Sequence, residues 1–195
     1  MLPNTLTAFL QVLPKLSKPL GSGNYAAAEM TLVMKRGAMS SSADTIIMDM
    51  DSVPRLLLVR RRSLYGQDRR DVTDAKGAVL YSLAENHLTF GRGIVGSDRG
   101  RAVRLGVKRM WAASTSAKVI TAKVEHNGVP HSLLLQGSMD SATVILEDGS
   151  PVARIRTYCN GFSAPRGSVC LTIAPGVDIG LAAALALCFD ECSWC

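Results

Sequence analysis

The sequence contains few aromatic residues. Phe, Tyr and Trp together make up 5% of the 195 residues, although apolar residues of all kinds reach 47%. The core must therefore be built mainly from aliphatic side chains, and there is little material for the aromatic platforms that stack on nucleic-acid bases. This apolar content excludes a disordered chain, and the length suits one domain with a short extension.

No apolar run is long enough to cross a membrane. The longest extends from Ile179 to Phe189 between two aspartates, about half of the roughly 20 apolar residues that a spanning helix needs. Its residues favour helix and are apolar on every side, which predicts a helix buried all round. Pro175 and Gly176 precede it. We expect this helix to run from about 177 to about 192, with Asp178 in its first turn, where a carboxylate complements the helix dipole.

Signatures of catalysis and of cofactor binding are also missing. The sequence has no nucleophile elbow, phosphate-binding glycine loop or dinucleotide fingerprint, and no acidic loop with calcium-ligand spacing precedes the predicted helix. Its three histidines are scattered over turns and strand ends, and only His126 and His131 could meet across a hairpin. The sequence therefore predicts a protein that is not an enzyme, with no catalytic residue, no cofactor and no metal site.

The cysteines form no recognisable disulfide framework. Their number is odd and three lie at the extreme C-terminus: Cys159, Cys170, Cys188, Cys192 and Cys195. This favours a reducing, intracellular setting, either cytoplasmic, at a membrane surface or nuclear. The last three have the spacing of radical-SAM cluster ligands, and the final four residues have the form of a prenylation box. An all-β context and a terminal cysteine argue against both, and thiols at a helix end are the preferred interpretation.

Acidic residues are absent before Glu29. Apolar residues between Leu2 and Leu20 fall near helical spacing, but no positive residue precedes them and Pro14 interrupts them, so a secretory signal is not expected. A transit peptide and a membrane-surface helix are alternatives to an arm packed on the domain, which is the interpretation we adopt. We expect residues 1–28 to form this extension and residues 29–195 to form the domain.

What the sequence does contain is a series of short strands separated by Gly, Asn and Asp turns. Several alternate between an apolar and a partly polar face, which is typical of a sheet with one wet face, and their regular spacing predicts an antiparallel sandwich or barrel. A barrel of about eleven strands can enclose a helix. The predicted strands are 30–35, 45–50, 55–62, 71–73, 78–83, 94–97, 101–108, 118–123, 132–136, 142–146, 152–156 and 169–173.

The basic residues that give the chain its formal charge of +6 are concentrated between Arg55 and Arg109. Such a surface favours phosphate-bearing partners, either lipid heads or nucleic acid, although solvated strand edges would look the same. On a strand, Arg60 and Arg62 share one face and Arg61 takes the other. We therefore predict a phosphate-binding patch from Arg60 and Arg62 together with two arginines a short loop away, Arg69 and Arg70.

Four stretches resemble the LURP-one-related family, whose members share the tubby C-terminal-like fold. Leu57–Leu64 resembles the opening basic strand of the family, Asp71–Tyr81 its first hairpin, and Leu134–Ser138 with Val152–Ile155 its later hairpins. The most specific is Leu171–Asp178, which resembles the Pro-Gly-Val-Asp entry to the central helix. The resemblance implies a mainly β protein, a closed twelve-stranded antiparallel barrel around a hydrophobic C-terminal helix.

Two functions follow as expectations. Tubby domains, which are similar in fold, bind phosphoinositides, so the resemblance implies a non-enzymatic module that recognises phosphoinositide or other anionic lipid heads at a membrane surface. The alternative is a protein-interaction or regulatory module, related to defence or transcription, without a lipid ligand. The scarcity of aromatic residues makes nucleic acid the less favoured partner, and no transmembrane span is expected.

Overall fold

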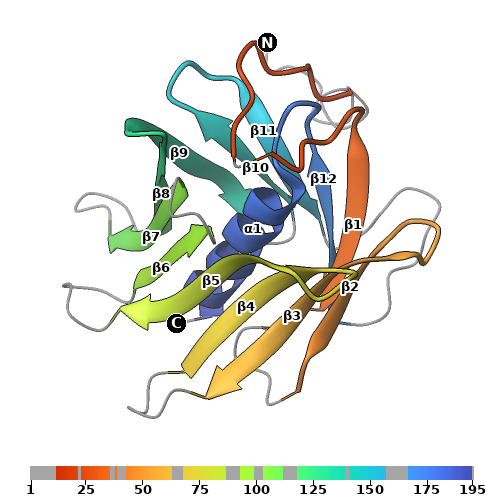
Figure 1. Ribbon diagram of the computed structural model, residues 1–195. Helices are drawn as coiled ribbons and strands as arrows, with labels where there is room; N and C mark the ends of the chain where they lie inside the picture. The colour runs from red at the N-terminus through yellow and green to blue at the C-terminus, as the bar shows by residue number, and fades with distance from the viewer. Residues whose placement is uncertain are drawn as a thin grey trace.

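The residues that the structure describes form a closed antiparallel barrel of twelve strands around one helix (Figure 1). The computed structural model describes residues 12–21, 23–35, 38, 43–62, 68–86, 93–98, 103–111, 118–138, 141–156 and 167–194. Each strand pairs with its neighbours in sequence, and β12 closes the barrel on β1. The strands are β1 (Met30–Lys35), β2 (Thr45–Asp49), β3 (Pro54–Arg62), β4 (Asp68–Asp74), β5 (Val79–Asn86), β6 (Gly93–Asp98), β7 (Val103–Trp111), β8 (Lys118–His126), β9 (Val129–Ser138), β10 (Ser141–Leu146), β11 (Pro151–Arg156) and β12 (Ser168–Ile173).

This architecture confirms the expected mainly β fold, and each predicted strand corresponds to an observed one. Alternation explains why these segments form strands: in β10, Ala142 and Val144 are buried while Ser141 and Thr143 are half-buried. Successive side chains of a strand point to opposite faces. Each strand therefore contributes one apolar row to the barrel interior.

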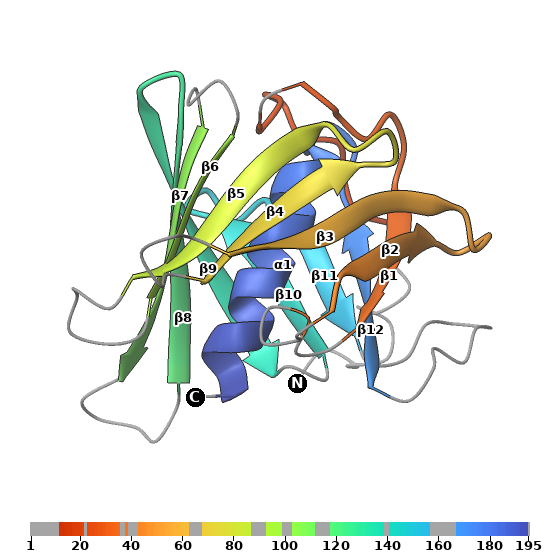
Figure 2. The same ribbon diagram turned by 60° about the horizontal axis from the view of Figure 1, so that its bottom comes forward.

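The interior is filled by helix α1 (Ile179–Trp194), which passes through the barrel (Figure 2). Leu181, Leu185 and Cys188 are at most 3% exposed, as expected of a helix that is apolar on every side. The small residues of α1 let the strands approach it closely. A Cβ atom added at Gly180 would lie 3.1 Å from side-chain atoms of Leu80 and Tyr81. The helix begins and ends about two residues later than the sequence predicted.

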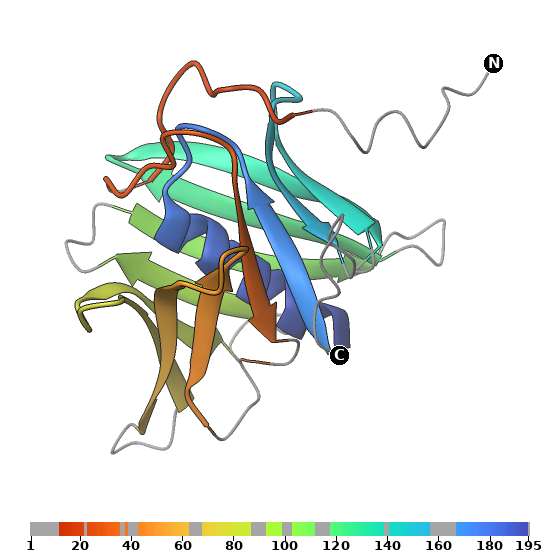
Figure 3. The ribbon, with the colours of Figure 1, turned by 90° about the vertical axis from the view of Figure 1, so that its right-hand side faces the viewer.

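Residues 12–21 and 23–29 lie across the end of the barrel at which α1 begins, and are called the strap below (Figure 3). Leu13, Leu16 and Leu20 are buried. The backbone of the strap pairs with the chain entering α1: Leu16 N–H donates to Pro175 O at 3.1 Å, and Asp178 N–H donates to Leu20 O at 2.8 Å. The strap and the entry to α1 thus form one hydrogen-bonded unit.

Asp178 joins this unit to the helix. It precedes α1 rather than lying in its first turn, as the sequence had suggested, and it is 2% exposed. Its Oδ1 accepts the N–H of Leu181 at 2.8 Å, as an N-cap does, and its Oδ2 accepts the N–H groups of Asn24 at 2.9 Å and Gly23 at 3.2 Å. A side chain expected to act through the helix dipole is therefore a cap shared with the strap.

Two further observations concern the cysteines and the membrane. The sequence showed no recognisable disulfide framework, but Cys170 of β12 is disulfide-bonded, whereas Cys188 is a buried free thiol. The terminal residue, Cys195, lies outside the described residues, so the interpretation of the last cysteines stays a prediction. Among the described residues, no helix combines the length and the apolar character needed to span a bilayer.

Candidate functional site: an arginine-lined groove on the outer face

The arginines predicted to form one patch are divided between the two faces of the barrel wall. Strands β3 and β4 pair so that Arg60 is opposite Arg70 and Arg61 is opposite Arg69. Arg70 is buried at 3% exposure, whereas the side chains of Arg61 and Arg69 are 58% and 52% exposed. The structure thus pairs Arg69 with Arg61, which the prediction left out. The backbone of Arg62 lies opposite Asp68, and its side chain is outside the described residues.

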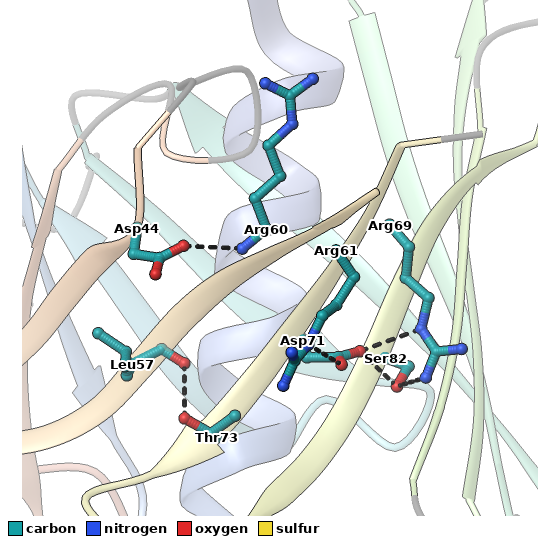
Figure 4. Close-up of polar contacts among 8 residues, drawn as sticks. All are labelled: Asp44, Leu57, Arg60, Arg61, Arg69, Asp71, Thr73 and Ser82. Atoms are coloured by element: carbon teal, nitrogen blue, oxygen red, sulfur yellow. Dashed lines mark hydrogen bonds and ion pairs between the residues drawn. The ribbon is translucent and has the colours of Figure 1, made fainter. Parts of the chain in front are cut away.

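A buried carboxylate organises the outer pair of arginines (Figure 4). Asp71 of β4 is 4% exposed. Its Oδ1 accepts Arg69 Nε–H at 3.0 Å and the Ser82 hydroxyl at 2.8 Å, and its Oδ2 receives Arg61 Nε–H at 3.4 Å. A terminal nitrogen of Arg69 also donates to Ser82 Oγ at 2.6 Å. This network fixes Arg69 over β5, the neighbouring strand.

Arg69 forms one wall of a groove of about 850 Å³ that runs over the outer face of β4 to β7. The groove exists because the outward side chains of β5 and β6 are small. Ser82 lies opposite Ser97, and Ala84 lies opposite Val95, whose side chain is 42% exposed. Short side chains on two adjacent strands hollow the sheet between the longer ones that flank them. The lining residues are Arg69, Gly77, Ala78, Val79, Ser82, Leu83, Ala84, Val95, Gly96, Ser97, Asp98 and Arg104.

The far wall is Arg104 of β7, which lies opposite Ser97. Arg104 is exposed and makes no hydrogen bond or ion pair within the part of the chain that the structure describes. Its cross-strand neighbour on β8 is Glu125, whose charge opposes its own. Three strand spacings separate β4 from β7, roughly 14 Å. The two long arginine side chains can therefore reach toward a ligand from opposite sides.

These groups suit an anion better than a cation. Guanidinium groups bind phosphate through paired N–H donors, and the hydroxyl of Ser97 adds a further donor, whereas that of Ser82 already donates to Asp71. One carboxylate, Asp98, lines the groove, but it is 7% exposed and accepts the N–H of Val103 at 3.1 Å. Ala84 and Val95 offer an apolar floor. Within the described residues, no group of His, Cys, Asp and Glu is arranged to hold a metal ion.

A second pair of arginines, Arg154 and Arg156, is less suited to an exposed anion. Both lie on β11, on the far side of the barrel from the groove. Burial lowers the pKa of Arg156, the charge of Arg154 lowers it further, and Glu29 acts in the opposite direction. Arg156 is thus partly withdrawn from water, whereas Arg104 is open to it.

Only part of the groove was predictable from the sequence. Arg61, Asp71 and Ser82 are missing from the predicted patch, although period-two alternation places Arg69 and Asp71 on one face of a strand. No local pattern in the sequence indicated that Arg104 and the small residues of the floor belong to the groove. They lie together because four strands pair in a particular register.

Comparison with known proteins agrees with the barrel. A family model described as LURP-one-related matches residues 30–190 of the chain. The X-ray structure of an Arabidopsis thaliana protein is similar, with a TM-score of 0.55 and 16% sequence identity over 86% of this chain and 93% of that one. At this identity the likeness concerns the fold alone. No curated protein matches the chain in sequence.

Proposed function

The chain belongs to the LURP-one-related family, and we propose that it is a non-enzymatic binding module that recognises phosphoinositide or other anionic lipid heads at an intracellular membrane surface. The observation that carries this proposal is the groove between Arg69 and Arg104. Of the four arginines first predicted, the proposal keeps Arg69. Arg70 is buried in the barrel wall, Arg60 lies opposite Arg70 and not opposite Arg69, and the side chain of Arg62 is outside the described residues.

The contacts in the groove support phosphate recognition. Asp71 holds Arg69 by its Nε, which leaves further N–H donors of the guanidinium for a ligand. Holding the side chain in advance reduces the conformational entropy that binding must otherwise cost. Arg104 approaches from the opposite wall, and Ser97 lies between the two. Two arginines and a hydroxyl would therefore meet one head group from several directions.

The first prediction tests the groove directly. The double variant Arg69→Ala/Arg104→Ala should weaken sedimentation with phosphoinositide-containing liposomes at least tenfold at low salt. Each charge-assisted hydrogen bond that is lost contributes about 1.5–3 kcal/mol, and tenfold corresponds to about 1.4 kcal/mol. Liposomes without phosphoinositide give the background. The double variant Lys18→Ala/Lys35→Ala is the matched control, because it removes the same charge from exposed sites on the strap and β1.

Three results would contradict the proposal: no liposome binding at low salt, binding that survives Arg69→Ala/Arg104→Ala unchanged, or an equal loss in Lys18→Ala/Lys35→Ala. An equal loss would mean that general charge alone drives binding, as the chain's net charge of +6 permits. In each case the protein-interaction module without a lipid ligand becomes the preferred function.

A further inference from the structure

The outer face of β3 carries two apolar side chains between two basic ones. Arg55, Leu57, Val59 and Arg61 are alternate residues of this strand and point outward, while Leu56 and Leu58 between them are at most 2% exposed. The six residue-to-residue steps from Arg55 to Arg61 span about 20 Å. An apolar pair is therefore bracketed by an arginine at each end.

Ile46 widens the apolar part of this surface. It lies on β2 directly opposite Leu57, and its side chain is 54% exposed. Opposed side chains in an antiparallel pair have Cβ atoms about 4.5–5.5 Å apart. Ile46, Arg55, Leu57, Val59 and Arg61 are called the β3 stripe below.

The two arginines of the β3 stripe cover buried carboxylates. Arg55 Nε–H donates to Asp49 at 2.7 Å and Arg61 Nε–H to Asp71 at 3.4 Å; the side chains of Arg55 and Arg61 are 51% and 58% exposed, whereas those of the two aspartates are 10% and 6% exposed. Hydrogen bonds from the N–H of Val53 and from Arg55 lower the pKa of Asp49, so this carboxylate is ionised and anchors Arg55. What faces outward at both ends of the stripe is guanidinium.

We propose that the β3 stripe is the surface by which the protein lies on an anionic bilayer. Ile46, Leu57 and Val59 would enter the interfacial region, and Arg55 and Arg61 would contact lipid phosphates on either side of them. Apolar area together with flanking basic charge is the combination that holds peripheral proteins at anionic membranes. Long arginine side chains can keep their charged ends among the head groups while apolar neighbours go deeper.

The β3 stripe is continuous with the groove, so this inference rests on the proposed function. Val59 lies opposite Asp71, and Asp71 accepts the hydroxyl of Ser82, which lines the groove. Arg61 lies opposite Arg69, the near wall of the groove. A barrel resting on its β3 stripe would thus hold the groove beside the head-group layer.

The test separates docking from head-group binding. Ile46→Ser should reduce partition onto vesicles of phosphatidylcholine with phosphoinositide about tenfold, since it removes the exposed aliphatic side chain of the stripe from the bilayer interface. The same variant should bind soluble inositol phosphates as the unchanged protein does. Val129→Ser is the matched control, because Val129 is also 54% exposed but lies at the start of β9. It should leave both measurements unchanged.

The depth to which residue 46 enters the bilayer is a second measurement, and it does not depend on affinity. Tryptophan at position 46, introduced as Ile46→Trp, should be quenched by lipids brominated on their acyl chains, and Val129→Trp should show no quenching beyond that of the native tryptophans. The docking inference is overturned if vesicle partition is unchanged in Ile46→Ser while inositol phosphate binds normally, or if both tryptophan variants are quenched alike. If inositol phosphate does not bind the unchanged protein but the protein partitions onto vesicles, head-group binding in the groove is rejected and docking through the β3 stripe is retained. No partition onto vesicles at all overturns both.

Discussion

At the residue scale, Asp178 shows how one side chain can connect separate parts of the chain. A single carboxylate caps α1 through Leu181 and holds two strap N–H groups. The N–H of Leu181 is buried together with Asp178, which is 2% exposed, so this donor depends on the carboxylate rather than on water. Buried donors that lose their acceptor are costly, because the protein cannot replace the water they left on folding.

The second prediction follows from this. Asp178→Ala should lower the free energy of unfolding by about 2–4 kcal/mol, because it removes a helix cap, leaves the buried N–H of Leu181 without its acceptor and releases the strap at Gly23 and Asn24. Urea denaturation measures the change. Asp148→Ala is a useful control, since Asp148 also accepts a backbone N–H, that of Ser150, but in an exposed turn. A loss in Asp178→Ala no larger than in Asp148→Ala would mean that the cap does not hold the strap.

At the element scale, the sequence was informative about strands and about α1. Alternation revealed β10 and β11, and the apolar run after Asp178 revealed a helix buried on every side. The groove was not predictable in this way. β4 begins at Asp68 and includes Asp68, Arg69 and Arg70, a charged segment without alternation that the sequence assigned to a loop. In a loop Arg69 and Arg70 could point the same way, but in a strand they point to opposite faces.

The third prediction concerns α1 as an element. Leu185 is 3% exposed, and the cavity around it is small and apolar. Leu185→Asp should prevent folding, because an unpaired charge at this place costs several kcal/mol. Leu185→Ala should fold with a loss of about 2–5 kcal/mol, the usual range for a truncated core side chain. Near-ultraviolet circular dichroism and urea denaturation distinguish the two. A folded Leu185→Asp protein of ordinary stability would mean that α1 is not held inside the barrel.

At the scale of the whole molecule, two regions of the closed barrel can be distinguished. One end is covered by the strap and by the entry to α1, and the outer wall of β3 to β7 carries the β3 stripe and the groove. In a closed barrel each strand is paired on both sides, so no edge is left open for pairing with another chain. Strand addition at a sheet edge is therefore excluded for these strands, and the proposed groove depends instead on outward side chains, the small ones of β5 and β6 among them.

The last prediction tests whether the strap stabilises the barrel as part of one unit. Leu20 is 2% exposed, and its backbone exchanges hydrogen bonds with Gly176 and Asp178. Leu20→Ala should cost about 2–5 kcal/mol and should speed hydrogen exchange at Leu181 and Ala182, because loosening the strap frees Asp178, to which both N–H groups donate. Val12→Ala is the control within the same segment, since Val12 is 69% exposed. Faster exchange confined to the strap in Leu20→Ala would show that the strap opens independently of α1. Inositol phosphate binding in the groove should be unchanged in both variants, because the groove lies on the outer wall and shares no residue with the strap.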